Sequence, residues 1–173
     1  MASTLTVFTI TWVGPYTKKE DLPNHKSNMI YLWTGQTGPK ATCKPCYCGF
    51  SGRGTKRFLD KDHKKDKILS GKRKCWIGYI KGGKRETQSG RKNTAYERSE
   101  NLIVFYLKNY QRCLSLNVIK KNSPNTPVGI FNILKKIDGS KRALKPKDIK
   151  PVPRILLWTG ERVITDEKKN VEM

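Results

Sequence analysis

The chain reads MIYLWTGQTGPKATCKPCYCGF from residue 29 to residue 50. Its two ends, MIYLW and CYCGF, are short apolar runs of the kind that form strands. The residues between them include two glycines and two prolines, which favours an antiparallel pair joined by a long hairpin. Because successive strand residues point to opposite faces, we expect Cys46 and Cys48 in the core and Tyr47 and Gly49 on the other face.

Apolar spacing predicts further elements along the chain. Three more strands are expected at residues 3–13, 75–80 and 154–160. Helices are expected at residues 55–67, 95–110 and 128–137, the last on the helical spacing of VGIFNILKKI. The sequence therefore predicts an α+β fold, in which a small antiparallel or mixed β-sheet is flanked by helices.

Composition divides the chain into three parts. Residues 1–27 are expected to form an N-terminal strand or arm, and residues 28–120 a central domain. The stretch KKNSPNTP, residues 120–127, has the composition of a linker. Residues 121–173 are then a basic C-terminal extension, which is expected to add contacts to a nucleic-acid duplex.

The charge of the chain indicates a polyanionic partner. Lys and Arg number 36 against 14 Asp and Glu, so the formal net charge is +22 and the pI is near 10.0. Residues 53–92 hold 15 of the basic residues and 4 of the acidic ones, a net charge of +11. Nucleic acid is favoured over a membrane, because no apolar run has transmembrane length and no basic helix is strongly amphipathic. A merely solvated basic surface is the alternative.

The five cysteines and the N-terminus point to a reducing, intracellular compartment. The number of cysteines is odd, and the first residues lack the charged start and uninterrupted apolar core of a signal peptide. The grouping of Cys43, Cys46 and Cys48 leaves a zinc site open as an alternative. No second pair follows at finger spacing, however, and only His25 and His63 could complete four ligands.

Glu100 occupies an unusual place in the helix expected at residues 95–110. At about 100° per residue it falls on the same face as Tyr96, Ile103 and Leu107. A carboxylate on an apolar face needs a function or a partner, and the two readings are a metal ligand and a buried acid paired with an arginine. Glu97, one turn earlier on a neighbouring face, is the second candidate.

Placed in order, several short motifs of residues 28–120 resemble the GIY-YIG nuclease family. They are Met29-Ile30-Tyr31, Tyr47-Cys48-Gly49, Arg57 ten residues after Tyr47, His63, Glu100 at the head of its helix, and Leu116-Asn117. The chain departs from the family pattern in having Met29 in place of Gly, Phe50 where several members carry Lys, a longer hairpin and a histidine two residues late. The resemblance implies a GIY-YIG-like nuclease domain.

The resemblance also implies roles for these residues. Tyr47 would act as general base on the attacking water, and Tyr31 would orient Tyr47 or the water. Arg57 would hold the scissile phosphate through two donors, with His63 in a less defined supporting role. Glu100 would bind one hard divalent cation, Mg²⁺ or another such as Mn²⁺. Phosphate contacts are expected from basic residues and one asparagine, namely Arg53, Lys56, Lys64, Lys65, Lys72, Arg73, Lys74 and Asn117.

The sequence thus predicts a metal-dependent endonuclease acting on DNA, with RNA not excluded. Two alternatives remain open: a basic nucleic-acid-binding module that keeps the scaffold without chemistry, and a small ribosomal or RNA-associated protein. Neither alternative has a use for Glu100 on an apolar face.

Overall fold

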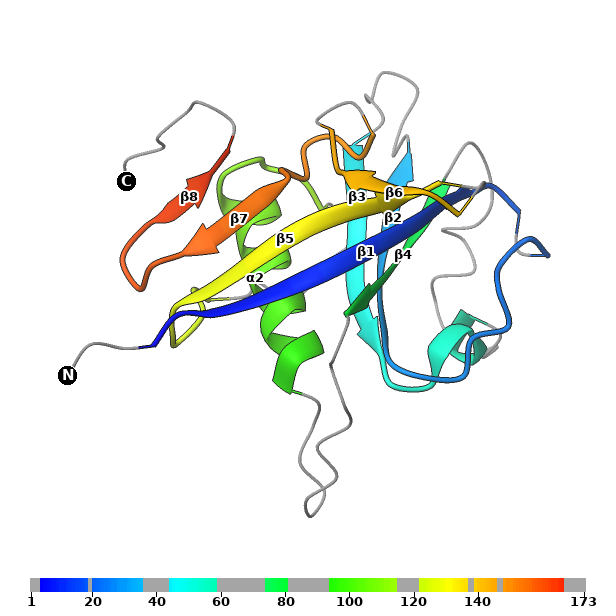
Figure 1. The fold of residues 1–173 in the computed structure, drawn as a ribbon, viewed down its shortest axis with the longest axis horizontal. Coiled ribbons are helices and arrows are strands. Elements are labelled where there is room, and N and C mark those ends of the chain that lie inside the picture. The colour runs from blue at the N-terminus through cyan, green and yellow to red at the C-terminus, as the bar shows by residue number, and fades with distance from the viewer. Residues whose placement is uncertain are drawn as a thin grey trace, which may run out of the picture.

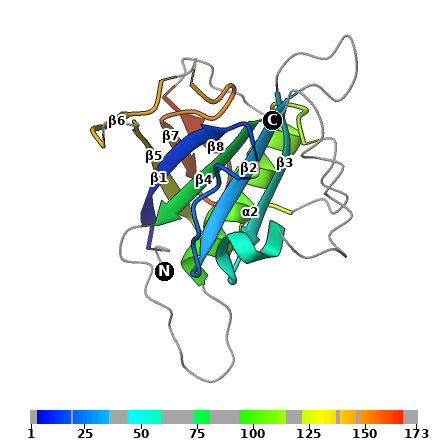
Figure 2. The same cartoon turned by 90° about the vertical axis from the view of Figure 1, so that its right-hand side faces the viewer.

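The computed structural model describes residues 4–18, 20–35, 44–58, 74–80, 94–114, 122–136, 139–145 and 148–166. These residues form one mixed sheet of eight strands, curled into a half-barrel, and a single α-helix that lies against it (Figures 1 and 2). The class is α+β, as the sequence predicts.

The strand order in the sheet is β3-β2-β4-β1-β5-β7-β8, and β6 pairs with β5. Every pairing is antiparallel except that of β1 with β5, which is parallel. The bounds of the strands are β1 Thr6–Tyr16, β2 Met29–Gly35, β3 Lys44–Ser51, β4 Lys74–Ile80, β5 Val128–Lys135, β6 Lys141–Ala143, β7 Ile155–Trp158 and β8 Val163–Thr165.

The strands expected from the sequence are present, and the pairing of MIYLW with CYCGF is confirmed. β2 and β3 are antiparallel neighbours, with Tyr31 opposite Gly49 and Trp33 opposite Tyr47. β2 lies in the middle of this part of the sheet because its other edge pairs with β4. Among the described strands, β3 lies at the edge of the sheet.

The helix expected at residues 128–137 is wrong, since this segment contains strand β5. From Ile130 to Leu134 the buried residues Ile130, Asn132 and Leu134 alternate with partly exposed ones, which is the period of a strand and not of a helix. Short apolar runs fit both periods, and here two neighbours, β1 and β7, supply ladder hydrogen bonds on both edges. Tertiary pairing decides between the two.

The helix expected at residues 95–110 is confirmed as α2, Thr94–Asn109. It packs against β3, β2 and β5, on the face of the sheet that carries Ile30, Leu32 and Cys48. We call this the inner face, and the face that carries Tyr31, Trp33 and Tyr47 the outer face. The helix expected at residues 55–67 is shorter where it is described: a 3-10 helix, η1, covers Gly54–Phe58, and residues 59–67 lie outside the described ranges.

The predicted facing of Cys46 is wrong, because β3 contains a bulge. Trp33 is opposite Tyr47 but Thr34 is opposite Pro45, so Cys46 is an extra residue in β3 and the alternation of faces is interrupted. Cys46 therefore packs in the outer cluster with Tyr47, and its thiol donates to the carbonyl oxygen of Trp33 at 3.4 Å. Cys48 faces the inner core as expected.

The three parts suggested by composition contribute to one continuous sheet. β1 comes from the N-terminal part and lies between β4 of the central part and β5 of the C-terminal part. None of the helices in the described ranges has the length and apolar composition of a membrane span.

Candidate functional site

Tyr31 and Tyr47 meet on the outer face of the sheet. Their ring centroids are 5.7 Å apart, with an angle of 30° between the ring planes. Tyr31 is 1% exposed on the central strand β2, whereas Tyr47, on the edge strand β3, is 8% exposed. The two phenol groups that the sequence singles out thus form one pair, and Tyr47 is the member nearer to solvent.

Gly49 is what allows the two rings to converge. Tyr31 is directly opposite Gly49 in the register of β2 and β3, and its ring lies over the glycine backbone. A Cβ atom at residue 49 would lie 2.7 Å from the hydroxyl oxygen of Tyr31 and 2.9 Å from Cε1 of Tyr47. Real side chains do not approach so closely, so the Tyr-x-Gly motif has a steric cause: the glycine makes room for the tyrosine pair.

The 3-10 helix η1, which contains Arg57, is fixed by the segment that precedes β2. The Thr55 amide donates to the carbonyl oxygen of His25 at 2.9 Å, and the His25 amide donates to Oγ1 of Thr55 at 3.1 Å. The Thr55 hydroxyl donates to the carbonyl oxygen of Pro23 at 2.8 Å. Gly54 has φ +61° and passes so close to the His25 carbonyl that no Cβ would fit. The backbone that carries Arg57 therefore has a defined position, while the side chain of Arg57 lies outside the description.

The segment before β2 is also held on the outer face of the sheet. The His25 ring packs edge-on against Tyr79 of β4, with ring centroids 4.7 Å apart, and the His25 Nε2 and Ser27 Oγ atoms are within hydrogen-bond distance at 2.8 Å. Leu22 packs into the same cluster as Tyr31 and Ile77. Residues 20–28 thus connect η1 to the outer face of the sheet.

Glu100 lies on α2, which covers the inner face, so it belongs to a different layer from the tyrosine pair. The glutamate is neither fully buried nor fully exposed. The first part of α2 contacts the end of β3, where the rings of Tyr96 and Phe50 are 5.7 Å apart, and the Ile80 amide donates to the Tyr96 hydroxyl at 3.1 Å. The start of α2, the end of β3 and η1 lie toward the same end of the molecule (Figures 1 and 2). Among the described strands, β3 has a neighbour on one side only, so the two faces of the described sheet meet at this edge.

The remaining predicted residues divide into exposed and undescribed positions. Arg53, Lys56 and Lys74 are exposed, the first two on the turn and η1 after β3 and the third at the start of β4. The positions outside the described ranges are His63, Lys64, Lys65, Lys72, Arg73 and Asn117.

The outer face is a poorly solvated environment that favours neutral side chains. Burial raises the pKa of Tyr79 to about 12, with smaller contributions from neighbouring Tyr16 and Tyr96. Burial also raises the pKa of Tyr16 and that of the Cys75 thiol. A phenolate on this face therefore needs a nearby cation to be stable.

The metal prediction has one described carboxylate to rest on. Within the described ranges, no group of three or more His, Cys, Asp or Glu side chains could hold a metal ion. Glu100 by itself suits Mg²⁺, which commonly takes one or two protein carboxylates together with substrate phosphates. The zinc alternative is not supported by the strand, since the bulge places Cys46 on the outer face and Cys48 on the inner face. Cys43 lies outside the described residues.

Sequence reasoning missed the residues that position η1. The hydrogen bonds between Thr55 and residues 23–25 span about thirty positions of the chain, and no periodicity or spacing signals such a contact.

Comparison of the chain with protein-family models, with curated proteins and with solved structures finds no match.

Proposed function

We propose that the protein is a metal-dependent endonuclease that hydrolyses phosphodiester bonds in DNA through a site of the GIY-YIG type. The observation that carries the proposal is the tyrosine pair: Tyr31 and Tyr47 come from neighbouring strands, and Gly49 is opposite Tyr31 where any side chain would separate the rings. Gly49 is buried on β3, at the edge of the described sheet, where glycine weakens a strand and adds no packing of its own. A requirement to hold two phenol groups together explains it.

The two tyrosines are suited to different tasks. Tyr47 is on the edge strand and more exposed, so its Oη can accept a proton from a water that attacks phosphorus. Tyr31 is enclosed beside it and orients the pair. Because the outer face favours a neutral phenol, proton acceptance requires positive charge close to Tyr47, and the basic residues after β3 would have to supply it.

Arg57 and Glu100 supply the remaining functions at the edge of the sheet. The Arg57 guanidinium would bind two oxygens of the scissile phosphate and balance the charge of the transition state. The Glu100 carboxylate would hold Mg²⁺, which when bound stabilises the leaving oxygen. The hydrogen bonds of Thr55 keep the backbone at Arg57 in place relative to residues 23–25, which precede β2.

A plasmid-nicking assay with Mg²⁺, with Mn²⁺ and with EDTA tests the proposal. Tyr47→Phe removes only a hydroxyl, so the rate is expected to fall by about 10² to 10⁴ while the fold survives; Tyr31→Phe is expected to be milder. Equal rates for wild type and Tyr47→Phe would assign the base to another residue. If the wild-type protein binds duplex DNA but does not nick it in the presence of metal, the result would instead favour the non-catalytic binding module.

Glu100→Ala separates a metal ligand from a structural acid. A ligand's loss should abolish Mg²⁺-dependent nicking, leave the melting temperature unchanged or higher, and leave DNA affinity the same or higher because a negative charge is removed. A buried acid paired with an arginine would behave in the opposite way, costing roughly 3 to 5 kcal/mol of stability. A destabilised variant that still cuts DNA would therefore disprove the role of Glu100, and Glu97→Ala would be the next variant to measure.

A further inference from the structure

One row of residues crosses the sheet from the tyrosine pair to a pair of lysines. In the strand registers, Tyr31 is opposite Ile77, Ile77 is opposite Val13, Val13 is beside Lys135, and Lys135 is opposite Lys141. Residues that are level on neighbouring strands point to the same face. The row therefore places both lysines on the outer face of the sheet, the face that carries the tyrosines.

The two lysines are arranged in a way that does not help the fold. Lys135, at the end of β5, and Lys141, at the start of β6, are both exposed and directly opposite each other. Like charges opposite each other across strands destabilise a sheet. Among the described residues, no acidic side chain forms an ion pair with either lysine. An anionic ligand between them would relieve the repulsion.

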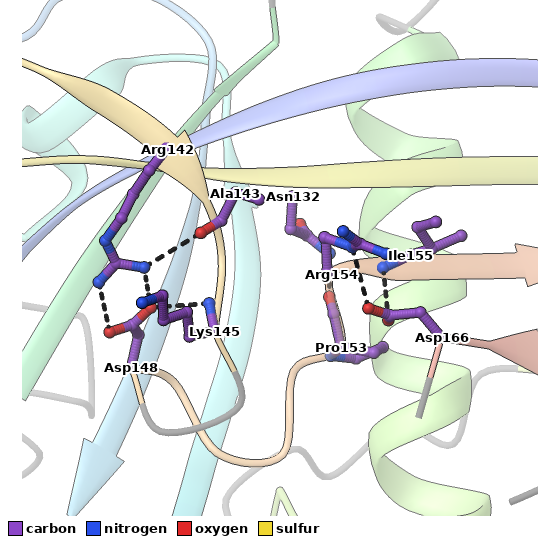
Figure 3. A network of polar contacts seen from close by, with 9 residues as sticks. All are labelled: Asn132, Arg142, Ala143, Lys145, Asp148, Pro153, Arg154, Ile155 and Asp166. Carbon is purple, nitrogen blue, oxygen red and sulfur yellow. Dashed lines mark hydrogen bonds and ion pairs between the residues drawn. The ribbon is translucent and has the colours of Figure 1, made fainter. Parts of the chain in front are cut away.

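The carboxylate of Asp148, in the loop after β6, is already bound by other groups of the chain (Figure 3). Both terminal nitrogens of Arg142 donate to the Asp148 carboxylate, at 2.7 and 2.8 Å, and the Lys145 amide donates to the same carboxylate at 2.8 Å. Asp148 thereby fixes the loop and does not neutralise the lysine ammonium groups.

Buried residues also anchor the described part of this loop, while Lys145 and Lys150 are exposed. Leu144, Ile149 and Val152 are buried in the inner core. Lys145 follows Leu144 and Lys150 follows Ile149 in the sequence. The positive groups thus stand on a fixed backbone, so little conformational entropy is lost when they bind a ligand.

We infer that Lys135 and Lys141, with Lys145 and Lys150 of the adjoining loop, form a second contact surface for the phosphate backbone of a DNA duplex. The choice of DNA as the polyanion rests on the proposed function. At about 4.8 Å between strands, Lys135 is about 14 Å and Lys141 about 19 Å from Tyr31 along the sheet. That distance corresponds to about four to six base-pair steps of 3.4 Å, so this surface holds the duplex to one side of the phosphate at the tyrosine pair.

The test is duplex binding in EDTA, where no metal-dependent chemistry takes place. Lys135→Ala/Lys141→Ala is compared with Lys18→Ala/Arg162→Ala, which removes the same charge from exposed positions elsewhere. With a DNA duplex of about 30 base pairs, the log–log slope of affinity against salt is expected to decrease by about two units in the first variant, at 0.9 per phosphate contact, and to change little in the second. Equal changes in both variants would show an effect of total charge only and overturn the inference, as would no change in either.

Two further measurements keep the outcome clear. The melting temperature of the lysine double variant is expected to stay the same or rise, because a repulsive pair is removed; Lys135→Gln/Lys141→Gln repeats the binding measurement if the alanine variant fails to fold. Nicking with Mg²⁺ is expected to fall in the lysine variant and to stay close to wild type in the Lys18→Ala/Arg162→Ala variant, because only the first removes groups that hold the duplex beside the tyrosine pair. If wild type does not nick DNA at all, the proposed function fails, whereas the slope in EDTA still decides whether this surface binds the duplex.

Discussion

Replacing Gly49 with alanine tests the steric basis of the tyrosine pair most directly. The added methyl group would lie 2.7 Å from Oη and 2.8 Å from Cζ of Tyr31, and 2.9 Å from Cε1 of Tyr47. Neither ring can withdraw easily, because both are buried in the outer cluster. The strands or the rings must therefore move.

The size of the effect follows from overpacking. An extra methyl group in a packed site costs about 1 to 3 kcal/mol, and for a chain of this length each kcal/mol lowers the melting temperature by about 2 to 4 °C. Gly49→Ala is therefore expected to melt about 2 to 12 °C below wild type in a circular-dichroism scan. Nicking measured well below that temperature should fall as well, because the phenol groups are displaced.

Gly78→Ala is the matched control. Its Cβ would be 2.8 Å from Cγ2 of Ile10 and 3.1 Å from the ring of Trp12, so a similar loss of stability is expected. Both neighbours belong to the inner core, however, and the tyrosine pair is left in place. Gly78→Ala should therefore keep its nicking rate at temperatures where it is folded.

A double-mutant cycle then isolates the contact with Tyr31. In a Tyr31→Ala background the ring that obstructs the new methyl group is absent, so Gly49→Ala should cost clearly less there than in wild type. If Gly49→Ala lowers the free energy of unfolding equally in both backgrounds, the glycine is required for a reason other than the close approach of the Tyr31 ring. The steric account of the motif is then refuted.

Two other predictions concern the surroundings of the pair. Thr55→Val keeps the shape of the side chain but removes the hydroxyl that donates to Pro23 and accepts from the His25 amide, so it should lower the free energy of unfolding in urea by about 1 to 3 kcal/mol and reduce nicking by loosening η1. Thr55→Ser should retain both stability and nicking, and a Val variant as stable as wild type would contradict the role of this hydroxyl. The pKa of Tyr79 is about 12 in the folded state and about 10 in the unfolded chain, so its stabilising contribution is complete below about pH 10 and is lost as the pH rises toward 12. Between about pH 9 and about pH 11, the free energy of unfolding of Tyr79→Phe should therefore fall less than that of wild type, and an identical fall would contradict the raised pKa.

The sequence predicts those elements whose signal is local. The pair β2–β3 follows from two apolar runs separated by turn residues, and α2 from a long stretch without Gly or Pro. β5 is mistaken for a helix because its apolar residues fit both periods over so short a run. Its strand state depends on pairing with β1, whose residues lie about 120 positions earlier, and no local pattern contains that information.

The candidate site divides along the same line. Alternation along β3 correctly brings Tyr47 to the face of Tyr31, but the facing of Cys46 depends on a bulge that only the register reveals. The role of Gly49 likewise requires knowing that it is opposite Tyr31. The support of η1 by Thr55 and residues 23–25 is a purely tertiary feature.

The central position of β1 has a consequence for how the molecule can hold a substrate. If the C-terminal part were joined to the rest by a linker alone, its basic residues could reach a duplex at many distances from the tyrosine pair. Instead β1 pairs with β4 along one edge and with β5 along the other, so hydrogen-bonded ladders set the distance from Tyr31 to Lys135. Under the proposed function, this fixed spacing would let Lys135, Lys141 and the basic residues after β3 contact one duplex in one relative placement. That placement would orient a phosphate at the tyrosine pair without any contact that reads base sequence.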